Sequence, residues 1–127
     1  MGLLPGGQTS DSHGISSNGV AVGASVGPNG STSTAFSWSK ATGIVDVGFG
    51  VNSIAYGSSN LGRVVGWSSG PRLAFARLGG VIDTLPNPLG VGAKAYDVNT
   101  CGTIVGNVEG ATLQTQRAVR WTKPNCD

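Results

Sequence analysis

Adjacent pairs of apolar residues recur along the chain, each within a short β-rich run. One set is Ala21-Val22, Val64-Val65 and Ile104-Val105, and a second set is Ala35-Phe36, Ala74-Phe75 and Ala118-Val119. A strand with one solvated face alternates apolar and polar residues, so adjacent apolar residues predict strands that are buried on both faces. The pattern therefore predicts β-sheets packed face to face.

Three stretches of the chain repeat one another. Segments 12–23, 55–66 and 95–106 align without gaps, and three columns are identical among them: Gly19, Gly62 and Gly102; Gly23, Gly66 and Gly106; Val22, Val65 and Val105. Self-similarity at a period of roughly 40 residues predicts tandem supersecondary units. We place repeat 1 at about 11–50, repeat 2 at about 51–90 and repeat 3 at about 91–127, in a single repeat domain spanning 1–127.

The third repeat is incomplete at its C-terminal side. Repeats 1 and 2 each end in a further β-rich run that starts with glycine, whereas the chain stops six residues after Trp121. At the other end of the chain, Gly2–Pro5 resembles Asp83–Pro86 of repeat 2. We therefore predict that residues 1–5 form an N-terminal strand that completes repeat 3.

Each repeat predicts a four-strand antiparallel meander, which makes the chain all-β. Asn18-Gly19 is the signal of a two-residue hairpin turn, and Gly62 and Gly102 supply positive φ at the matching positions. Only three lysines are present to protect sheet edges, which favours a closed architecture. β-Propeller-like blades fit this pattern best, and a β-trefoil and a β-prism are the alternatives.

Composition removes several classes of function. The 127 residues include 22 glycines and 11% charged residues, and the net charge of +2 is scattered along the chain. Without a basic stripe, no nucleic-acid partner is expected. No apolar stretch approaches the roughly 20 residues that cross a bilayer, so no membrane insertion is expected. Met1–Pro5 is too short for the apolar region of a signal peptide.

Neither a metal nor a cofactor is predicted. Cys101 and Cys126 are too few for a zinc site and too far apart for a C-x-x-C motif. Asp11, Asp97 and Glu109 lie in different segments without the spacing of a calcium loop. The glycine pairs lead into strands rather than into a helix N-terminus, so no nucleotide cofactor is expected.

The two cysteines are disulfide candidates. A bond between Cys101 and Cys126 would close a loop of about 25 residues and stabilise the fold by about 3 kcal/mol in the chain-entropy model. Such a bond needs an oxidising compartment. Two unrelated thiols are the alternative.

The sequence contains no convincing set of catalytic residues, so no enzymatic activity is expected. His13 is the single histidine and no G-x-S-x-G motif is present, which argues against a nucleophile triad. Asp46 and Asp83 are the only candidate carboxylate pair for glycoside hydrolysis. They occupy equivalent positions of two repeats, and such positions are usually structural.

Recognition through loops and aromatic residues is what remains. The most variable loops between repeats span about 25–34, 69–72 and 109–116, and binding often lies in such loops. Trp67 and Arg72 have no counterparts in the other repeats, so they are predicted ligand contacts. Packing of Trp67 between blades is the alternative. His13, Tyr56 and Tyr96 share one column and complete the predicted set.

The repeat resembles the bacterial HAF-type extracellular repeat. The motifs that carry the resemblance are Ala95-Tyr96 with Val98-Asn99, Gly62-Arg63-Val64-Val65-Gly66, Ala35-Phe36-Ser37-Trp38 and Asp46-Val47-Gly48, with departures at Arg77 and Val119. The resemblance implies a propeller-like array that is exported or displayed on the surface of bacteria. It supplies no catalytic residues. Because Met1–Pro5 holds no signal peptide, extracellular and cytoplasmic locations both stay open.

These observations favour a non-enzymatic extracellular binding module for a glycan or another surface ligand. A structural assembly or spacer module is one alternative, and a small hydrolase built on His13, Asp46 or Asp83 is another. Three blades are too few for a closed propeller, which typically has four to eight blades. We therefore predict a homodimer that forms a six-bladed ring with exchanged N-terminal strands, whereas a trefoil or prism would close within one chain.

Overall fold

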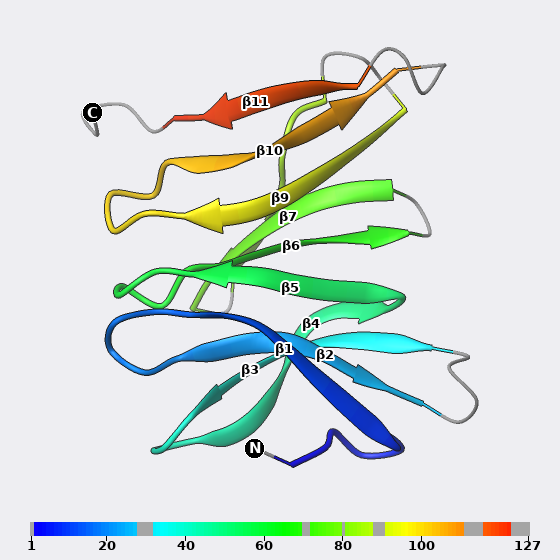
Figure 1. The fold of residues 1–127 in the computed structure, drawn as a ribbon, viewed down its shortest axis with the longest axis vertical. Helices are drawn as coiled ribbons and strands as arrows, with labels where there is room; N and C mark the ends of the chain where they lie inside the picture. The colour runs from blue at the N-terminus through cyan, green and yellow to red at the C-terminus, as the bar shows by residue number, and fades with distance from the viewer. Residues whose placement is uncertain are drawn as a thin grey trace.

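The computed structural model of the chain describes residues 2–27, 32–69, 72–79, 81–87, 91–110 and 116–122. These residues form eleven strands and no helix, in three antiparallel sheets (Figure 1). The predicted all-β class is therefore confirmed. The first sheet contains β1 (Thr9–Ile15), β2 (Ala21–Val26), β3 (Ser33–Ser39) and β4 (Gly43–Val51); the second contains β5 (Ser53–Ser58), β6 (Val64–Ser69), β7 (Arg72–Leu78) and β8 (Val81–Thr84); the third contains β9 (Gly92–Val98), β10 (Ile104–Glu109) and β11 (Arg117–Trp121).

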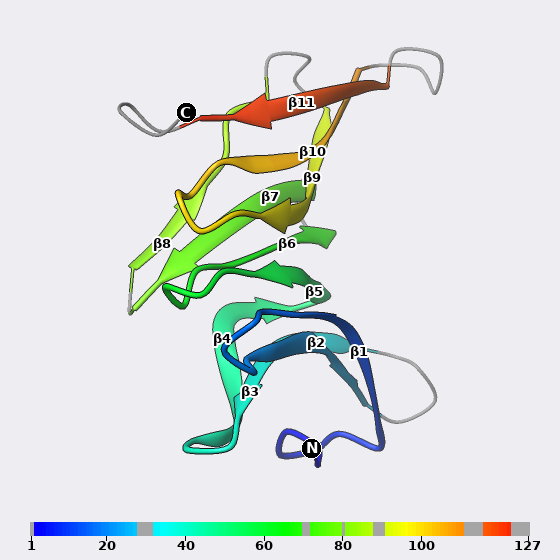
Figure 2. The same ribbon diagram turned by 60° about the vertical axis from the view of Figure 1, so that its left-hand side comes forward.

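The three sheets are stacked in chain order, with the second sheet between the first and the third (Figures 1 and 2). Strands are paired in sequence order within each sheet, so every sheet is a meander. The first strand β1 contacts β5, and β5 in turn contacts β9. In the described part of the chain, this row of sheets does not show the threefold closure that a trefoil or a prism requires (Figure 1).

Adjacent apolar residues face opposite sides of the second sheet. Val64 belongs to the core cluster between the first and second sheets, and Val65 belongs to the cluster between the second and third sheets. In the same way, Phe75 belongs to the cluster between the first and second sheets, and Ala74 belongs to the cluster between the second and third sheets. The predicted burial of both faces is confirmed for this sheet, which lies between two others. It is wrong for the third sheet, where Val105 is 46% exposed and Ala118 is exposed, because no further sheet covers that face in the described part of the chain.

A β-bulge occurs at the same position in the first strand of every sheet. The pairing register with the second strand shifts at His13, Tyr56 and Tyr96. The second strand carries glycine near each bulge: a Cβ atom on Gly23, Gly66 or Gly106 would lie 1.9–2.0 Å from a carbonyl oxygen of the first strand. The identical glycine column is therefore explained by the close approach of two backbones.

The hairpin between the first two strands has the same turn in all three sheets. In the first sheet, Gly19 N donates to Ser16 O at 2.9 Å and Ser16 N donates to Val20 O at 3.0 Å. Gly19 has a φ of +86°, whereas Asn18 is not among the described residues with positive φ. The predicted two-residue Asn-Gly turn is therefore wrong, because that turn needs positive φ at both residues; a three-residue loop ending in a left-handed glycine is present instead.

Residues 2–5 do not complete the third sheet of their own chain. That sheet contains three strands in the described part of the chain, and residues 2–5 form none. Leu4 N instead donates to Ser25 Oγ of the first sheet at 3.2 Å. A turn closed by the Gly7 N to Leu4 O hydrogen bond leads directly into β1, which lies far from β11 in the stack (Figure 1). The predicted N-terminal strand is therefore wrong within one chain, and its exchange between two chains stays a prediction.

We predict that Gly66→Ala lowers the free energy of unfolding by about 2–3 kcal/mol, because its Cβ would overlap the Ile54 carbonyl oxygen at 2.0 Å and force β5 away from β6. Gly79→Ala is the control, since a Cβ there meets no atom within 4 Å and only the positive φ of +61° opposes it, which costs about 1 kcal/mol. Urea unfolding of both variants measures the difference. An equal loss in the two variants would contradict the explanation of the glycine column.

Candidate functional site

The bulge residues form an aromatic column across the three sheets. The ring of Tyr56 lies between those of His13 and Tyr96, with centroid separations of 5.2 Å and 5.1 Å and tilted planes. Bulges redirect side chains, and here they bring three residues of one sequence column into contact. The structure thus brings together three of the predicted site residues, and it gives them a structural role in joining the sheets.

Trp67 is also attached to this column. Its indole Nε1 donates to the Tyr56 hydroxyl oxygen at 3.1 Å, and the Lys94 ammonium of the third sheet lies 4.3 Å from its ring centroid. The side chain is half-buried, and both its polar group and its ring face have partners within the chain. These contacts favour the interpretation that Trp67 packs between sheets. A ligand contact by Trp67 stays a prediction.

Arg72 forms an ion pair across the same interface. Its guanidinium donates to Glu109 Oε2 at 3.1 Å, which joins β7 of the second sheet to β10 of the third. The Arg72 side chain is 58% exposed, so the ion pair contributes little to stability. Sequence reasoning identified Arg72 but missed Glu109 and Lys94, because nothing in their spacing shows that they face the second sheet.

Tyr96 ends the column at an exposed position. Partial burial raises the pKa of its phenol, and the nearby Tyr56 and Glu109 raise it further. The phenol is therefore protonated at neutral pH. It is 38% exposed, so it offers a neutral hydroxyl at the end of the aromatic column.

The residues of the hydrolase hypothesis do not converge. His13 lies on β1 and Asp46 on β4, which are the two opposite edge strands of the first sheet. Asp83 lies on β8 of the second sheet, opposite Ala76, whereas Asp46 lies opposite Phe36. Since Ala76 matches Ser37 in the repeat, the two carboxylates differ by one residue in register. They therefore do not occupy equivalent places.

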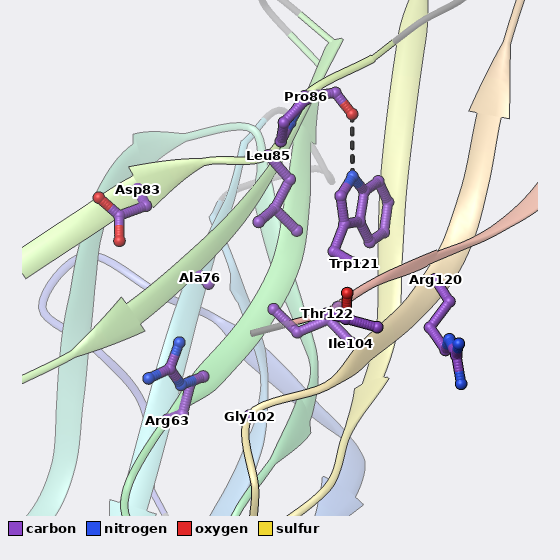
Figure 3. Close-up of a pocket in the computed structure, with 10 residues that line it drawn as sticks. All are labelled: Arg63, Ala76, Asp83, Leu85, Pro86, Gly102, Ile104, Arg120, Trp121 and Thr122. Atoms are coloured by element: carbon purple, nitrogen blue, oxygen red, sulfur yellow. Dashed lines mark hydrogen bonds between the residues drawn. The ribbon is translucent and has the colours of Figure 1, made fainter. Parts of the chain in front are cut away.

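A groove lies between the second and third sheets (Figure 3). Its volume is about 370 Å³. We call it the Trp121 groove; it is lined by Arg63, Ala76, Asp83, Leu85, Pro86, Gly102, Ile104, Arg120, Trp121 and Thr122. The lining combines an apolar floor, an aromatic ring and charged side chains, which is the usual composition of small-ligand pockets.

Trp121 is held in place at this groove. Its Nε1 donates to Pro86 O at 2.9 Å, and the ring packs against the core cluster that contains Ile104 (Figure 3). Leu85 packs on the same cluster from the second sheet. The ring is thus fixed by its neighbours while it remains partly exposed. A fixed aromatic ring loses little conformational entropy when a ligand stacks on it.

Charged groups lie beside this ring. The side chains of Arg63 and Asp83 lie on one side of the groove, whereas the side chain of Arg120 points away from the other groove residues (Figure 3). Arg120 lies opposite Val105 in the register, so its side chain belongs to the outer face of the third sheet. Neither Arg63 nor Asp83 forms an ion pair with another described residue, so one guanidinium group and one carboxylate are available to a polar ligand. Sequence reasoning missed this site because its residues come from two repeats; the A-F-x-W motif that ends in Trp38 was the one available signal for Trp121.

Several predicted features lie partly or wholly outside the described residues. Cys101 is disulfide-bonded, whereas its predicted partner, Cys126, lies outside the described part of the chain. The variable loops include residues 28–31, 70–71 and 111–115, which also lie outside it. Within the described ranges, no group of three or more His, Cys, Asp or Glu side chains is placed to hold a metal ion.

Comparison with models of protein families, with curated proteins and with solved structures gave no match for this chain. Among the described residues there is also no helix with the length and apolarity needed to cross a membrane.

We predict that Tyr56→Phe lowers the free energy of unfolding by about 1 kcal/mol, because the half-buried Trp67 Nε1 would lose its acceptor. Tyr96→Phe is the matched control: it removes a phenol hydroxyl from the same column at a more exposed position, and a change within about 0.5 kcal/mol is expected. Chemical denaturation followed by tryptophan fluorescence compares the two. If Tyr96→Phe cost more than Tyr56→Phe, the proposed anchoring of Trp67 would be wrong.

Proposed function

We propose that the protein is a non-enzymatic binding module that takes a saccharide into the Trp121 groove. The observation that carries the proposal is the Trp121 ring, which is fixed by its bond to Pro86 O and lies over an apolar floor. The face of an indole offers an apolar surface to the C–H face of a sugar ring, and polar groups at the rim can bind its hydroxyls. The volume of about 370 Å³ is sufficient for a small ligand.

The rim of the groove is suited to a ligand with hydroxyl or anionic groups. Arg63 offers guanidinium donors and Asp83 offers a carboxylate acceptor. Donors and acceptors of both kinds are what a polyhydroxylated ligand needs. Since His13, Asp46 and Asp83 do not meet, the groove holds no evident catalytic set. The resemblance to HAF-type repeats further supports an extracellular or surface location for such a module.

We predict that Trp121→Ala weakens saccharide binding at least tenfold, which corresponds to about 1.4 kcal/mol. A glycan array with neutral and acidic oligosaccharides identifies a bound sugar, and titration calorimetry then measures its affinity for each variant. Arg63→Ala should weaken the same interaction by removing a rim donor.

Arg117→Ala is the control for Arg63→Ala, because Arg117 is an exposed arginine on β11 that does not line the groove. Arg117→Ala should bind like the wild type. Failure to bind any saccharide on the array, or binding that is unchanged in a folded Trp121→Ala variant, would exclude this function.

Association with a second copy of the chain is the second candidate function. Val22 and Val65 are fully buried by the next sheet in the stack, whereas the matching Val105 on the outer face of the third sheet is 46% exposed. Ala118 is exposed although its counterparts Ala35 and Ala74 are fully buried. A face that is covered in two repeats and open in the third favours further stacking, as in a propeller-like ring completed by a second chain.

Exchange of residues 2–5 is one form of this assembly. It would break the Leu4 to Ser25 hydrogen bond and expose Leu4, which is buried on the first sheet. Asp97 also opposes close stacking, because it stands where Gly14 and Gly57 allow the next sheet to approach. We propose association around Val105 without exchange of residues 2–5, at a wider spacing from the third sheet than the spacing between the sheets of one chain.

We predict a dimer at micromolar concentration that Val105→Lys dissociates, because the charge would be buried on association. Light scattering coupled to size exclusion measures the mass. Val81→Lys is the control, since Val81 is exposed at 64% on β8 of the second sheet and should leave the dimer intact. A wild-type monomer would rule out the assembly function without affecting saccharide binding.

A further inference from the structure

The outer face of the first sheet is buried at Phe36. Val22 packs toward the second sheet, so its neighbour Gly23 on β2 faces outward, away from the stack. Phe36 lies opposite Gly23 in the register and therefore also faces outward. Its side chain is nevertheless fully buried. Since no sheet lies on that side in the described part of the chain, another segment covers this face.

The N-terminal residues lie over this face. Ser25 also faces outward from β2, and its Oγ accepts a hydrogen bond from Leu4 N at 3.2 Å. Gly7 lies so close to the same hydroxyl that a Cβ there would be 2.3 Å from its oxygen. Leu4 and Ser25 are both buried, and residues 2–7 lie at this end of the stack (Figure 2). A second chain therefore cannot stack on the first sheet without displacing them.

The outer face of the third sheet is open, and its charges lie in one row. Val105 on the central strand β10 lies opposite Asp97 on β9 and opposite Arg120 on β11. All three residues are exposed, and neither charged residue forms an ion pair with another described residue. Neighbouring strands lie about 4.8 Å apart, so the two charged residues are about 10 Å apart with Val105 midway between them.

This row is complementary to a second copy of itself. A twofold rotation about an axis along β10 places Asp97 opposite the partner's Arg120 and brings the two copies of Val105 together. Two opposite-charge pairs then flank one apolar contact. A twofold axis across the strands would instead place each carboxylate against another carboxylate, which is unfavourable. The order of charges along the row thus selects one of the two arrangements.

We propose that two chains associate through the outer faces of their third sheets, about a twofold axis that runs along β10. This inference rests on the proposed association around Val105, and it assigns the partner's surface, which is the same face of a second copy. Sheets that pack face to face lie about 10 Å apart, so Asp97 does not have to fit the close approach that Gly57 allows within the chain.

Two consequences follow from this arrangement. Assembly stops at two chains, because a twofold interface uses the same face of both and the opposite end of each stack is covered by residues 2–7. The Trp121 groove lies between the second and third sheets, on the other face of the third sheet. The dimer therefore carries two accessible grooves.

Charge reversal tests the pairing. Asp97→Arg gives a row with two positive groups, and Arg120→Asp gives a row with two negative groups, so each variant alone should self-associate at least about tenfold more weakly than the wild type. An equimolar mixture of the two variants should form a heterodimer, because every facing pair is again of opposite charge. The double variant, with both changes in one chain, should dimerise like the wild type. Light scattering coupled to size exclusion measures each mass.

Val105→Cys gives a readout that does not depend on Asp97, whose Oδ1 accepts a hydrogen bond from Val98 N and whose replacement weakens this hairpin. The two new thiols face each other across the axis, so a short bismaleimide should link most chains into a covalent dimer. Val81→Cys is the matched control, since Val81 is 64% exposed on β8 and lies away from the axis. It should give little covalent dimer at the same protein concentration.

The outcomes separate this inference from the proposals on which it rests. A wild-type chain that stays monomeric excludes the association and the inference together, and leaves the saccharide function untouched. If the wild type dimerises but the two folded charge variants do not form a heterodimer, the twofold arrangement is excluded while association stands. The same conclusion follows if Val105→Cys is linked no better than Val81→Cys.

Discussion

The close approach of backbones at the bulge glycines is the constraint on which the remaining structure depends. Only a residue without a side chain permits the first strand to bulge over the second, as at Gly66 below the carbonyl of Ile54. Gly14 and Gly57 allow a second close approach, because a Cβ on Gly14 would lie 2.4 Å from the Tyr56 carbonyl oxygen of the next sheet. Together these contacts fix the spacing between strands and between sheets.

The arrangement of side chains on both sides of the stack of sheets depends on this spacing. On the bulge side, the sheets are close enough for His13, Tyr56 and Tyr96 to contact one another, so aromatic side chains fill the space between sheets. Toward the third and fourth strands, the groove lined by Trp121 lies between the second and third sheets. Contacts that join the sheets and surfaces that suit a ligand are thus separated by position in the repeat.

The predicted site residues illustrate the limit of reasoning from a repeat alignment. Tyr56, Trp67 and Arg72 were chosen for their column or for their lack of counterparts, and all three make contacts within the chain. Lack of a counterpart also arises when a residue fits one particular interface, as Trp67 does beneath Lys94. The groove around Trp121 escaped prediction because an alignment compares equivalent residues and does not show which repeats face each other.

The sequence by itself determined the all-β class, the three-fold repetition, the meander of each sheet and the burial of both faces of the central sheet, because these depend on local propensity and on adjacent apolar residues such as Val64-Val65. The glycines in the hairpin signals also predicted the positive φ of Gly62 and Gly102. Only the tertiary structure decided the place of residues 2–5, the partners of Trp67 and Arg72, and the Trp121 groove. These depend on which sheets stack and at what spacing, which is a property of contacts between residues distant in the chain rather than of any local pattern.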